Sequence, residues 1–301
     1  MVAPDFEQLR QQRIEDERMS IAICARFAGR RVVRAGTSAS AASQQQQHQQ
    51  QQRLRFSSVV KKNEADFTRL RNSWWAPQGE FEILSRMNDL RVPFMTEALS
   101  ECRSDASPAV GLHNVLRGID IIDVGCGGGL LTEPLARLGG NLTGLDIVSS
   151  NIDAARAHAE KDPEIRDRIR YICGQIEDVD EQFDALVASE VVEHVDNLDS
   201  FITHCARVIK PRGHLFFTTI NRTLLSLLIA KIGAEYIANI VPRGLHDWRM
   251  FVTPEELQLK LTKNGCAVAR VKGMMYHPIG GHWSWTDNDG VNYALHAVKL
   301  P

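Results

Sequence analysis

The sequence predicts an α/β fold built on a doubly wound, mostly parallel β-sheet. Short apolar segments rich in β-branched residues alternate with helical patterns through most of the chain beyond residue 120. One such strand, 121–124, runs directly into a cluster of glycines, and a helical pattern begins where the glycines stop. Alternation of this kind places the strands in one sheet with helices on both faces.

The expected elements follow in order along one folded domain, residues 61–301. A helix at 64–70 ends before Pro77, and a second helix runs from 88 to about 99. Seven strands are expected, at 121–124, 141–147, 170–174, 183–188, 214–219, 267–271 and 293–298. Further helices are expected after the glycines and at 151–160, 198–209 and 254–264.

Composition excludes several classes of function. The formal net charge of the 301 residues is −2, which gives no bulk attraction to nucleic acid or to acidic membranes. The six cysteines are scattered without a C-x-x-C pair, which indicates reduced thiols rather than a metal site. An Asn/Asp-Pro-Pro-aromatic segment after the fourth strand is expected of methyltransferases that act on amino groups of DNA bases. No such segment follows the strand at 183–188. We therefore expect no nucleic-acid partner.

Residues 1–60 have the composition of a disordered extension and a mitochondrial transit peptide. Residues 19–60 contain six arginines but no acidic residue and no lysine, and 19–34 can form a basic amphipathic helix. The tract 44–52 is almost entirely glutamine and is expected to be unstructured. The alternative is a disordered basic tail. Because presequences act from the N-terminus, we expect Met19 to serve as a start site.

The glycine cluster has the spacing Gly125-x-Gly127-x-Gly129. A dinucleotide-binding fingerprint would need its third glycine where Leu130 stands. The shorter form, with Asp123 two residues before it, resembles motif I of the class I S-adenosylmethionine (SAM) methyltransferases. Glycine allows positive φ and close approach of a ligand to the backbone, so Gly125 and Gly127 are expected to contact the cofactor.

Asp146 ends the second strand, about twenty residues beyond the glycines. A carboxylate at this place can accept hydrogen bonds from both hydroxyls of a ribose. The alternative is that it caps the following helix. Together with the glycine spacing, the ribose interpretation is favoured.

The segment 189–195 follows the fourth strand, at the edge where open α/β sheets bind ligands. If it forms a helical turn, Glu190, Glu193 and His194 lie on one face at i, i+3 and i+4. Such a group could hold a divalent cation, or His194 could act as a general base. The alternative is a helix start that favours acidic residues.

Two apolar features have more than one interpretation. The adjacent Trp74 and Trp75 fit core or lid packing, or contact with an aromatic or prenyl substrate.

The segment 223–241 is the most apolar of the chain, but Lys231 and Glu235 argue against a membrane crossing. It fits a helix packed on the core, a helix in the membrane interface, or a lid over a lipid substrate.

Taken together, the motifs resemble the ubiquinone biosynthesis O-methyltransferase family from about residue 66 to the end. Examples are Asp123-Val-Gly-Cys-Gly-Gly-Gly129 and Thr219-Ile-Asn-Arg222. The segments that carry the resemblance are 74–75, 79–81, 86–91, 123–129, 143–146, 190–195, 219–222, 233–236, 241–247 and 291–293.

The resemblance implies a seven-stranded sheet with the last strand antiparallel. It implies O-methylation of polyprenylated catechol-type intermediates, polyprenyl-dihydroxybenzoate and demethylubiquinol among them. It also implies a set of ligand contacts: SAM at Arg91, Gly125, Asp146 and Ser189, and Mg²⁺ at Glu190, Glu193 and His194.

The resemblance further implies partners and a location. Other ubiquinone-biosynthesis proteins are expected in a membrane-associated complex, on the matrix side of the mitochondrial inner membrane. The 223–241 segment is then the favoured membrane contact. The alternatives are a methyltransferase for another small molecule and a non-catalytic SAM-binding scaffold subunit.

Overall fold

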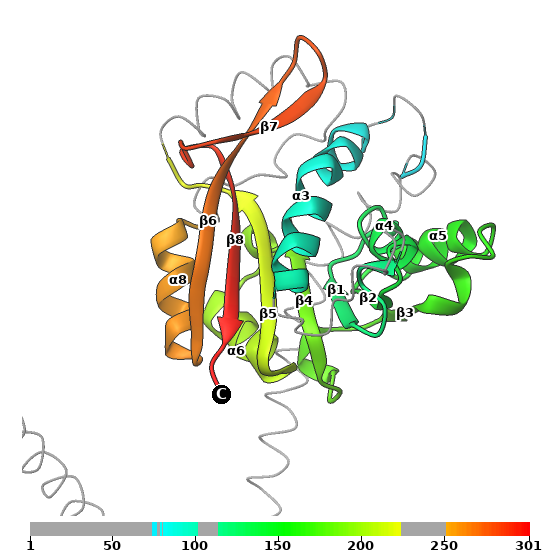
Figure 1. Cartoon of the computed structure of the whole chain (residues 1–301), viewed down its shortest axis with the longest axis horizontal. Helices are drawn as coiled ribbons and strands as arrows, with labels where there is room; N and C mark the ends of the chain where they lie inside the picture. The colour runs from blue at the N-terminus through cyan, green and yellow to red at the C-terminus, as the bar shows by residue number, and fades with distance from the viewer. Residues whose placement is uncertain (1–73, 77–78, 80, 102–113, 224–250) are drawn as a thin grey trace, which may run out of the picture. The chain divides into compact units, whose positions relative to one another are not determined.

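The computed structural model describes residues 74–76, 79, 81–101, 114–223 and 251–301. The predicted transit peptide, the helix expected at 64–70 and, apart from Thr223, the apolar segment 223–241 lie outside these residues. The described part is organised around one mixed sheet (Figure 1).

The sheet has the strand order β3-β2-β1-β4-β5-β8-β6-β7. The first five strands in that order are parallel to one another, and β8 is antiparallel to both β5 and β6. The bounds are β1 (Asp120–Val124), β2 (Asn141–Asp146), β3 (Ile169–Cys173), β4 (Phe183–Ser189), β5 (Ile209–Ile220), β6 (Cys266–His277), β7 (His282–Thr286) and β8 (Asn292–Lys299). The doubly wound, mostly parallel sheet with an antiparallel last strand is confirmed.

The sheet has eight described strands where seven were predicted. β6 continues well beyond residue 271 to His277, and the chain returns as β7, antiparallel to it. Pro278, Gly280 and Gly281 stand in the connection between them. Trp283 on β7 donates from Nε1 to the carbonyl of Ile83, 3.0 Å away, so the extra strand packs on the helix that begins there.

The helices cover both faces of the sheet. Their bounds are α3 (Glu82–Glu101), α4 (Thr132–Arg137), α5 (Ser149–Ala159), α6 (Leu198–Arg207) and α8 (Pro254–Lys263). The prediction was wrong for the start of α3, which begins at Glu82 and continues through Pro93. Proline removes one helical hydrogen bond, but Phe94 and Met95 beside it are buried in the core and hold the helix in place.

Alternate strand residues face two cores. Ile121 packs in a cluster with residues of α3 and α4, and its neighbour Ile122 packs in a second cluster with residues of α6 and α8. The central strands are thus buried on both sides, as their continuous apolar sequences predicted. Among the described helices, none has the length and apolar character that a bilayer crossing requires.

A candidate active site at the carboxyl edge of the sheet

The carboxyl ends of the central parallel strands bring the predicted site residues to one edge. Val124 of β1 is in register with Leu145 of β2 and with Ala188 of β4. Ser189 in turn pairs with Thr218 of β5. The glycine loop, Asp146 and the segment after Ser189 therefore emerge side by side.

The glycine loop has the backbone that the sequence predicted. Gly125, Gly127 and Gly129 have φ of +73°, +54° and +86°. A Cβ on Gly125 would lie 2.4 Å from Val191, and one on Gly129 would lie 2.4 Å from the hydroxyl of Tyr171. Both conformation and space therefore require glycine here.

Asp146 joins the end of β2 to the glycine loop. Its Oδ2 accepts from the backbone N–H of Gly127 at 2.9 Å, and its Oδ1 accepts from the N–H of Val148 at 2.8 Å. Burial raises the pKa of this carboxyl, and the backbone donors act in the opposite direction. Val148, not Asp146, is the N-cap residue of α5. A carboxylate has about four acceptor positions, so capacity remains for a ribose hydroxyl.

The two adjacent tryptophans contact the glycine loop. The ring of Trp74 is stacked on Phe81, with centroids 3.7 Å apart, and is buried. The Nε1 of Trp75 donates to the carbonyl of Gly128 at 2.9 Å, and its ring stacks on His158. These contacts support the packing interpretation of the pair.

Arg91 heads a chain of hydrogen bonds that ends on Glu190. Its Nη1 donates to Ser189 Oγ, 2.5 Å away, and the Ser189 and Thr218 hydroxyls lie 2.5 Å apart. Thr218 Oγ1 lies 3.0 Å from Glu190 Oε1. Because a guanidinium only donates and a carboxylate only accepts, Ser189 donates to Thr218 and Thr218 donates to Glu190.

The second carboxyl group of the site, that of Glu193, is held by Thr219. Thr219 Oγ1 donates to Glu193 Oε2 at 2.7 Å, and Glu193 Oε1 is buried without a hydrogen-bond partner among the described residues. Burial raises the pKa of Glu193 well above its usual range, and the nearby Glu190 raises it further. Burial also raises the pKa of Glu190, against the opposing charge of Arg91.

The helical face predicted for Glu190, Glu193 and His194 is not formed. The segment makes only one 3₁₀ turn, Val192–His194, and Glu190 before it has a φ of +56°. Glu193 points inward and is 3% exposed, whereas His194 is exposed. The structure therefore brings the two carboxyl groups together and leaves the imidazole outside that pair.

These two carboxyl groups suit a hard divalent cation in chemistry and charge. Mg²⁺ prefers oxygen ligands and commonly binds through one or two carboxylates and several waters. Glu193 Oε1, with its unused acceptor positions, is a fitting ligand atom. Within the described ranges, however, no three His, Cys, Asp or Glu side chains are grouped as a metal site.

Three polar residues of this site were not predicted as site residues from the sequence, namely Thr218, Thr219 and Asn151. The two threonines stand at the carboxyl end of β5, and that position alone could have singled them out. Asn151 lies in the first turn of α5 and is 3% exposed. Its role depends on a contact with Trp74, which is 77 residues away in sequence.

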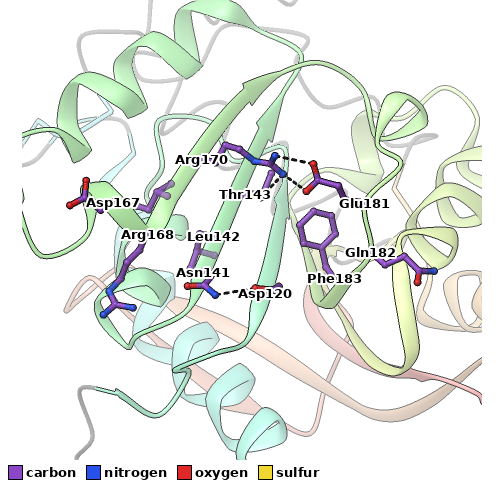
Figure 2. Close-up of a pocket in the computed structure, with 11 residues that line it drawn as sticks. Asp120, Asn141, Leu142, Thr143, Asp167, Arg168, Arg170, Glu181, Gln182 and Phe183 are labelled. Carbon is purple, nitrogen blue, oxygen red and sulfur yellow. Dashed lines mark hydrogen bonds and ion pairs between the residues drawn. The ribbon is translucent and has the colours of Figure 1, made fainter.

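A polar cleft of about 400 Å³ lies at the opposite, amino edge of the sheet (Figure 2). Two pairs of its polar side chains bind each other: Arg170 binds Glu181, and Asn141 donates to Asp120 at 3.0 Å. The cleft contains none of the predicted site residues. The carboxyl edge is therefore the candidate active site.

Comparison with known proteins agrees with this location. The family described as "Methyltransferase domain" matches residues 122–217, from β1 to β5. The ubiquinone biosynthesis O-methyltransferase of Methylobacterium sp. is 41% identical over 245 residues, which are 80% of this chain and 96% of that protein. This chain belongs to the ubiquinone biosynthesis O-methyltransferase family. It is therefore a SAM-dependent methyltransferase.

Other members of the ubiquinone biosynthesis O-methyltransferase family are longer. The mitochondrial enzyme of Rattus norvegicus is 48% identical over 246 residues, covering 80% of this chain and 70% of that protein. The match spans 63% of the human protein. Among solved structures, magnesium protoporphyrin IX methyltransferase from Synechocystis with bound SAH shares the fold: the TM-score is 0.56 at 20% identity, over 77% of this chain and 94% of that one.

Proposed function

We propose that this enzyme transfers the methyl group of SAM to a hydroxyl of polyprenylated catechol intermediates in ubiquinone biosynthesis. The intermediates are of the polyprenyl-dihydroxybenzoate and demethylubiquinol types. The observation that carries the proposal is the pair of acids beside the glycine loop, Glu190 half-buried and Glu193 buried, in a chain 41–48% identical to relatives that bear this name.

The cofactor is proposed to lie against Gly125 and Gly127, with its ribose at Asp146. Arg91 and Ser189, joined by a hydrogen bond, border the same edge. When bound, SAM supplies an electrophilic methyl group on a sulfonium centre. The protein then has mainly to position the acceptor oxygen and to favour its ionised form.

Two devices are proposed to favour that ionised form. Phenols titrate near pH 10, so few are ionised at neutral pH. Glu190 and Glu193 would hold a divalent cation, Mg²⁺ in the first instance, whose charge would favour a phenolate. His194, exposed at the end of the same turn, is the proposed base for the hydroxyl proton, since imidazoles titrate near neutral pH. His194 is not needed as a metal ligand in this arrangement.

The decisive experiment is the variant Glu193→Ala. We expect turnover of a short-chain catechol analogue to be lost, while isothermal titration still detects SAM binding. Glu181→Ala is the matched control, because this acid is exposed and pairs with Arg170 at the opposite edge.

Isothermal titrations of SAM and the catechol analogue with and without Mg²⁺ test the role of the cation. The variant His194→Asn tests the role of the base. Retention of most activity by Glu193→Ala, or methylation of an amine but not a catechol, would contradict the proposal.

We propose a mitochondrial location, peripheral on the matrix side of the inner membrane. The mitochondrial relatives and the arginine-rich composition of 19–60 support it. The membrane contact is proposed to be the apolar segment 223–241. The proposed partners are other ubiquinone-biosynthesis proteins. Import of a fusion that starts at Met19 tests the location, and cytosolic retention would contradict it.

A further inference from the structure

A buried chain of hydrogen bonds connects Trp74 to Asp146 through Asn151. Trp74 donates from Nε1 to Asn151 Oδ1 at 3.2 Å, and Asn151 donates from Nδ2 to Asp146 Oδ1 at 3.4 Å. All three side chains are less than a tenth exposed. The chain joins the segment before α3, the first turn of α5 and the end of β2.

The direction of this chain is fixed by its two ends. An indole N–H can only donate and an ionised carboxylate can only accept. The amide of Asn151 must therefore turn its oxygen to Trp74 and its nitrogen to Asp146. Without the indole N–H, the amide could rotate and place its oxygen against the carboxylate. Trp74 thus selects the orientation in which Asn151 supports Asp146.

Trp74 also supports the other oxygen of Asp146, indirectly through its contact with the glycine loop. Its ring lies so close to the glycine loop that a Cβ on Gly127 or Gly128 would come within 2.6 or 2.4 Å of it. The N–H of Gly127 is the donor to Asp146 Oδ2. The ring is itself held by stacking on Phe81, so it is a fixed support for both sides of the carboxylate.

We propose that Trp74 and Asn151 are positioning residues that hold the Asp146 carboxylate in the orientation that binds the cofactor ribose. The inference rests on the ribose role proposed above for Asp146. It predicts a specific effect. Loss of either residue weakens the part of cofactor binding that depends on the ribose hydroxyls, and not binding in general.

The test compares S-adenosylhomocysteine with its 2′-deoxy and 3′-deoxy analogues by isothermal titration. The quantity measured is the preference for the full ribose, as a ratio of dissociation constants. We expect Asn151→Ala and Trp74→Phe to lower this preference by about three- to tenfold, as for loss of one supporting hydrogen bond. Trp74→Phe keeps an aromatic ring against Phe81 and the loop, and removes only the donor.

Trp75→Phe is the matched control. It removes the N–H that binds the carbonyl of Gly128, on a residue that makes no contact with Asn151 or Asp146 among the described hydrogen bonds. We expect the ratio to be unchanged in this variant, even if both affinities fall. Thermal unfolding establishes that each variant is folded. If one of Trp74→Phe and Asn151→Ala does not fold, the other is sufficient to test the inference.

Two results would overturn the inference, and they are distinguishable. If Asp146→Asn abolishes the preference but Asn151→Ala and Trp74→Phe weaken all three ligands equally, the two residues are only structural. If Asp146→Asn leaves the preference intact, the ribose role of Asp146 fails, and this inference fails with it.

Discussion

Thr219 donates a 2.7 Å hydrogen bond to Glu193, and its neighbour Thr218 lies 3.0 Å from Glu190, to which it donates. Consecutive residues of a strand point to opposite faces, so the two carboxyl groups are held from different sides of the end of β5. One strand end thus supports both acids of the candidate active site. Substitution of either threonine should therefore affect one of the two carboxyl groups directly.

Thr219→Val should lower turnover by about tenfold while SAM affinity stays near that of the parent enzyme. Valine matches threonine in shape but cannot donate, so Glu193 Oε2 loses its hydrogen bond. That bond lowers the pKa of Glu193 against the effect of burial, so its loss raises the pKa and leaves less carboxylate at neutral pH. Activity should therefore recover in part as the assay pH is raised.

Thr203→Val is the control for this change. Thr203 is exposed on α6 and its hydroxyl donates only to the carbonyl of Asp199 within the helix, as far as the described contacts go. We expect its turnover and pH profile to match those of the parent enzyme. A Thr219→Val enzyme with full activity at every pH would show that Glu193 does not depend on this bond.

Gly129→Ala should destabilise the fold and weaken SAM binding. An alanine at this position would have to adopt a φ of +86°. Its Cβ would lie 2.4 Å from the Tyr171 hydroxyl. Strain and crowding add, and we expect a loss of about 2–4 kcal/mol in the free energy of unfolding, measured in urea.

Gly265→Ala separates strain from crowding. Gly265 has a φ of +72°, but a Cβ there meets nothing within 4 Å, so only the strain of about 1 kcal/mol is expected. Adding Tyr171→Phe to Gly129→Ala removes the clashing hydroxyl and should restore part of the loss. Equal losses for the two alanine variants would show that crowding at the loop is unimportant.

The sequence predicted those parts of the site that depend on local pattern. Strand, glycine turn and helix follow each other directly, so Gly125 and Asp146 could be placed from spacing alone. His194 could not, because a 3₁₀ turn and a helical turn share the same short sequence but direct the third side chain differently. The strand β7 was missed although Trp283 and Trp285 alternate with polar residues in the period of a strand, a signal that the sequence did contain.

Contacts between distant segments were beyond sequence reasoning altogether. The tryptophan pair was recognised as packing or substrate contact, but its partner Asn151 is 77 residues from Trp74 and has no motif of its own. The same holds for Arg91, whose predicted place near the cofactor gave no hint of its bond to Ser189, 98 residues away.

Acidification should destabilise the protein through His214 and His296. These rings lie 2.9 Å apart between Nδ1 and Nε2, buried beside Phe216. Burial lowers the pKa of both, that of His296 to about 4, with repulsion from His214 and Arg270 adding to the effect. In the unfolded chain these imidazoles take up protons below about pH 6.5. In the folded chain His296 does so only near pH 4, and the pKa of His214 is also lowered. Stability should therefore fall as the pH drops through this window.

His296→Gln should reduce this slope, since glutamine does not titrate and can still hydrogen bond to His214. The measurement is the free energy of unfolding in urea at several pH values between 4 and 7. Identical slopes for the parent enzyme and the variant would show that this ring does not contribute to the acid sensitivity.

Asp123 should act in the opposite direction over nearly the same pH range. It is 2% exposed on β1, and burial raises its pKa to about 6, although Thr132 donates to it at 2.6 Å and Arg91 is near. The folded chain holds this proton up to about pH 6, whereas the unfolded chain loses it near 4. Its contribution to stability is therefore present at low pH and is lost as the pH rises from about 4 to 6.

Asp123→Asn should therefore raise the free energy of unfolding at pH 7, by at most about 3 kcal/mol for a pKa shift of roughly two units. The amide oxygen of asparagine can still accept from Thr132, so the contact survives without the buried charge. The gain should shrink as the pH falls and be nearly lost at pH 4, where the aspartate is protonated in the folded chain and about half protonated in the unfolded chain. Urea unfolding of the cofactor-free protein at pH 7, 5.5 and 4 gives the three values. A gain that is the same at all three would mean that better packing, and not relief of a buried charge, is its cause.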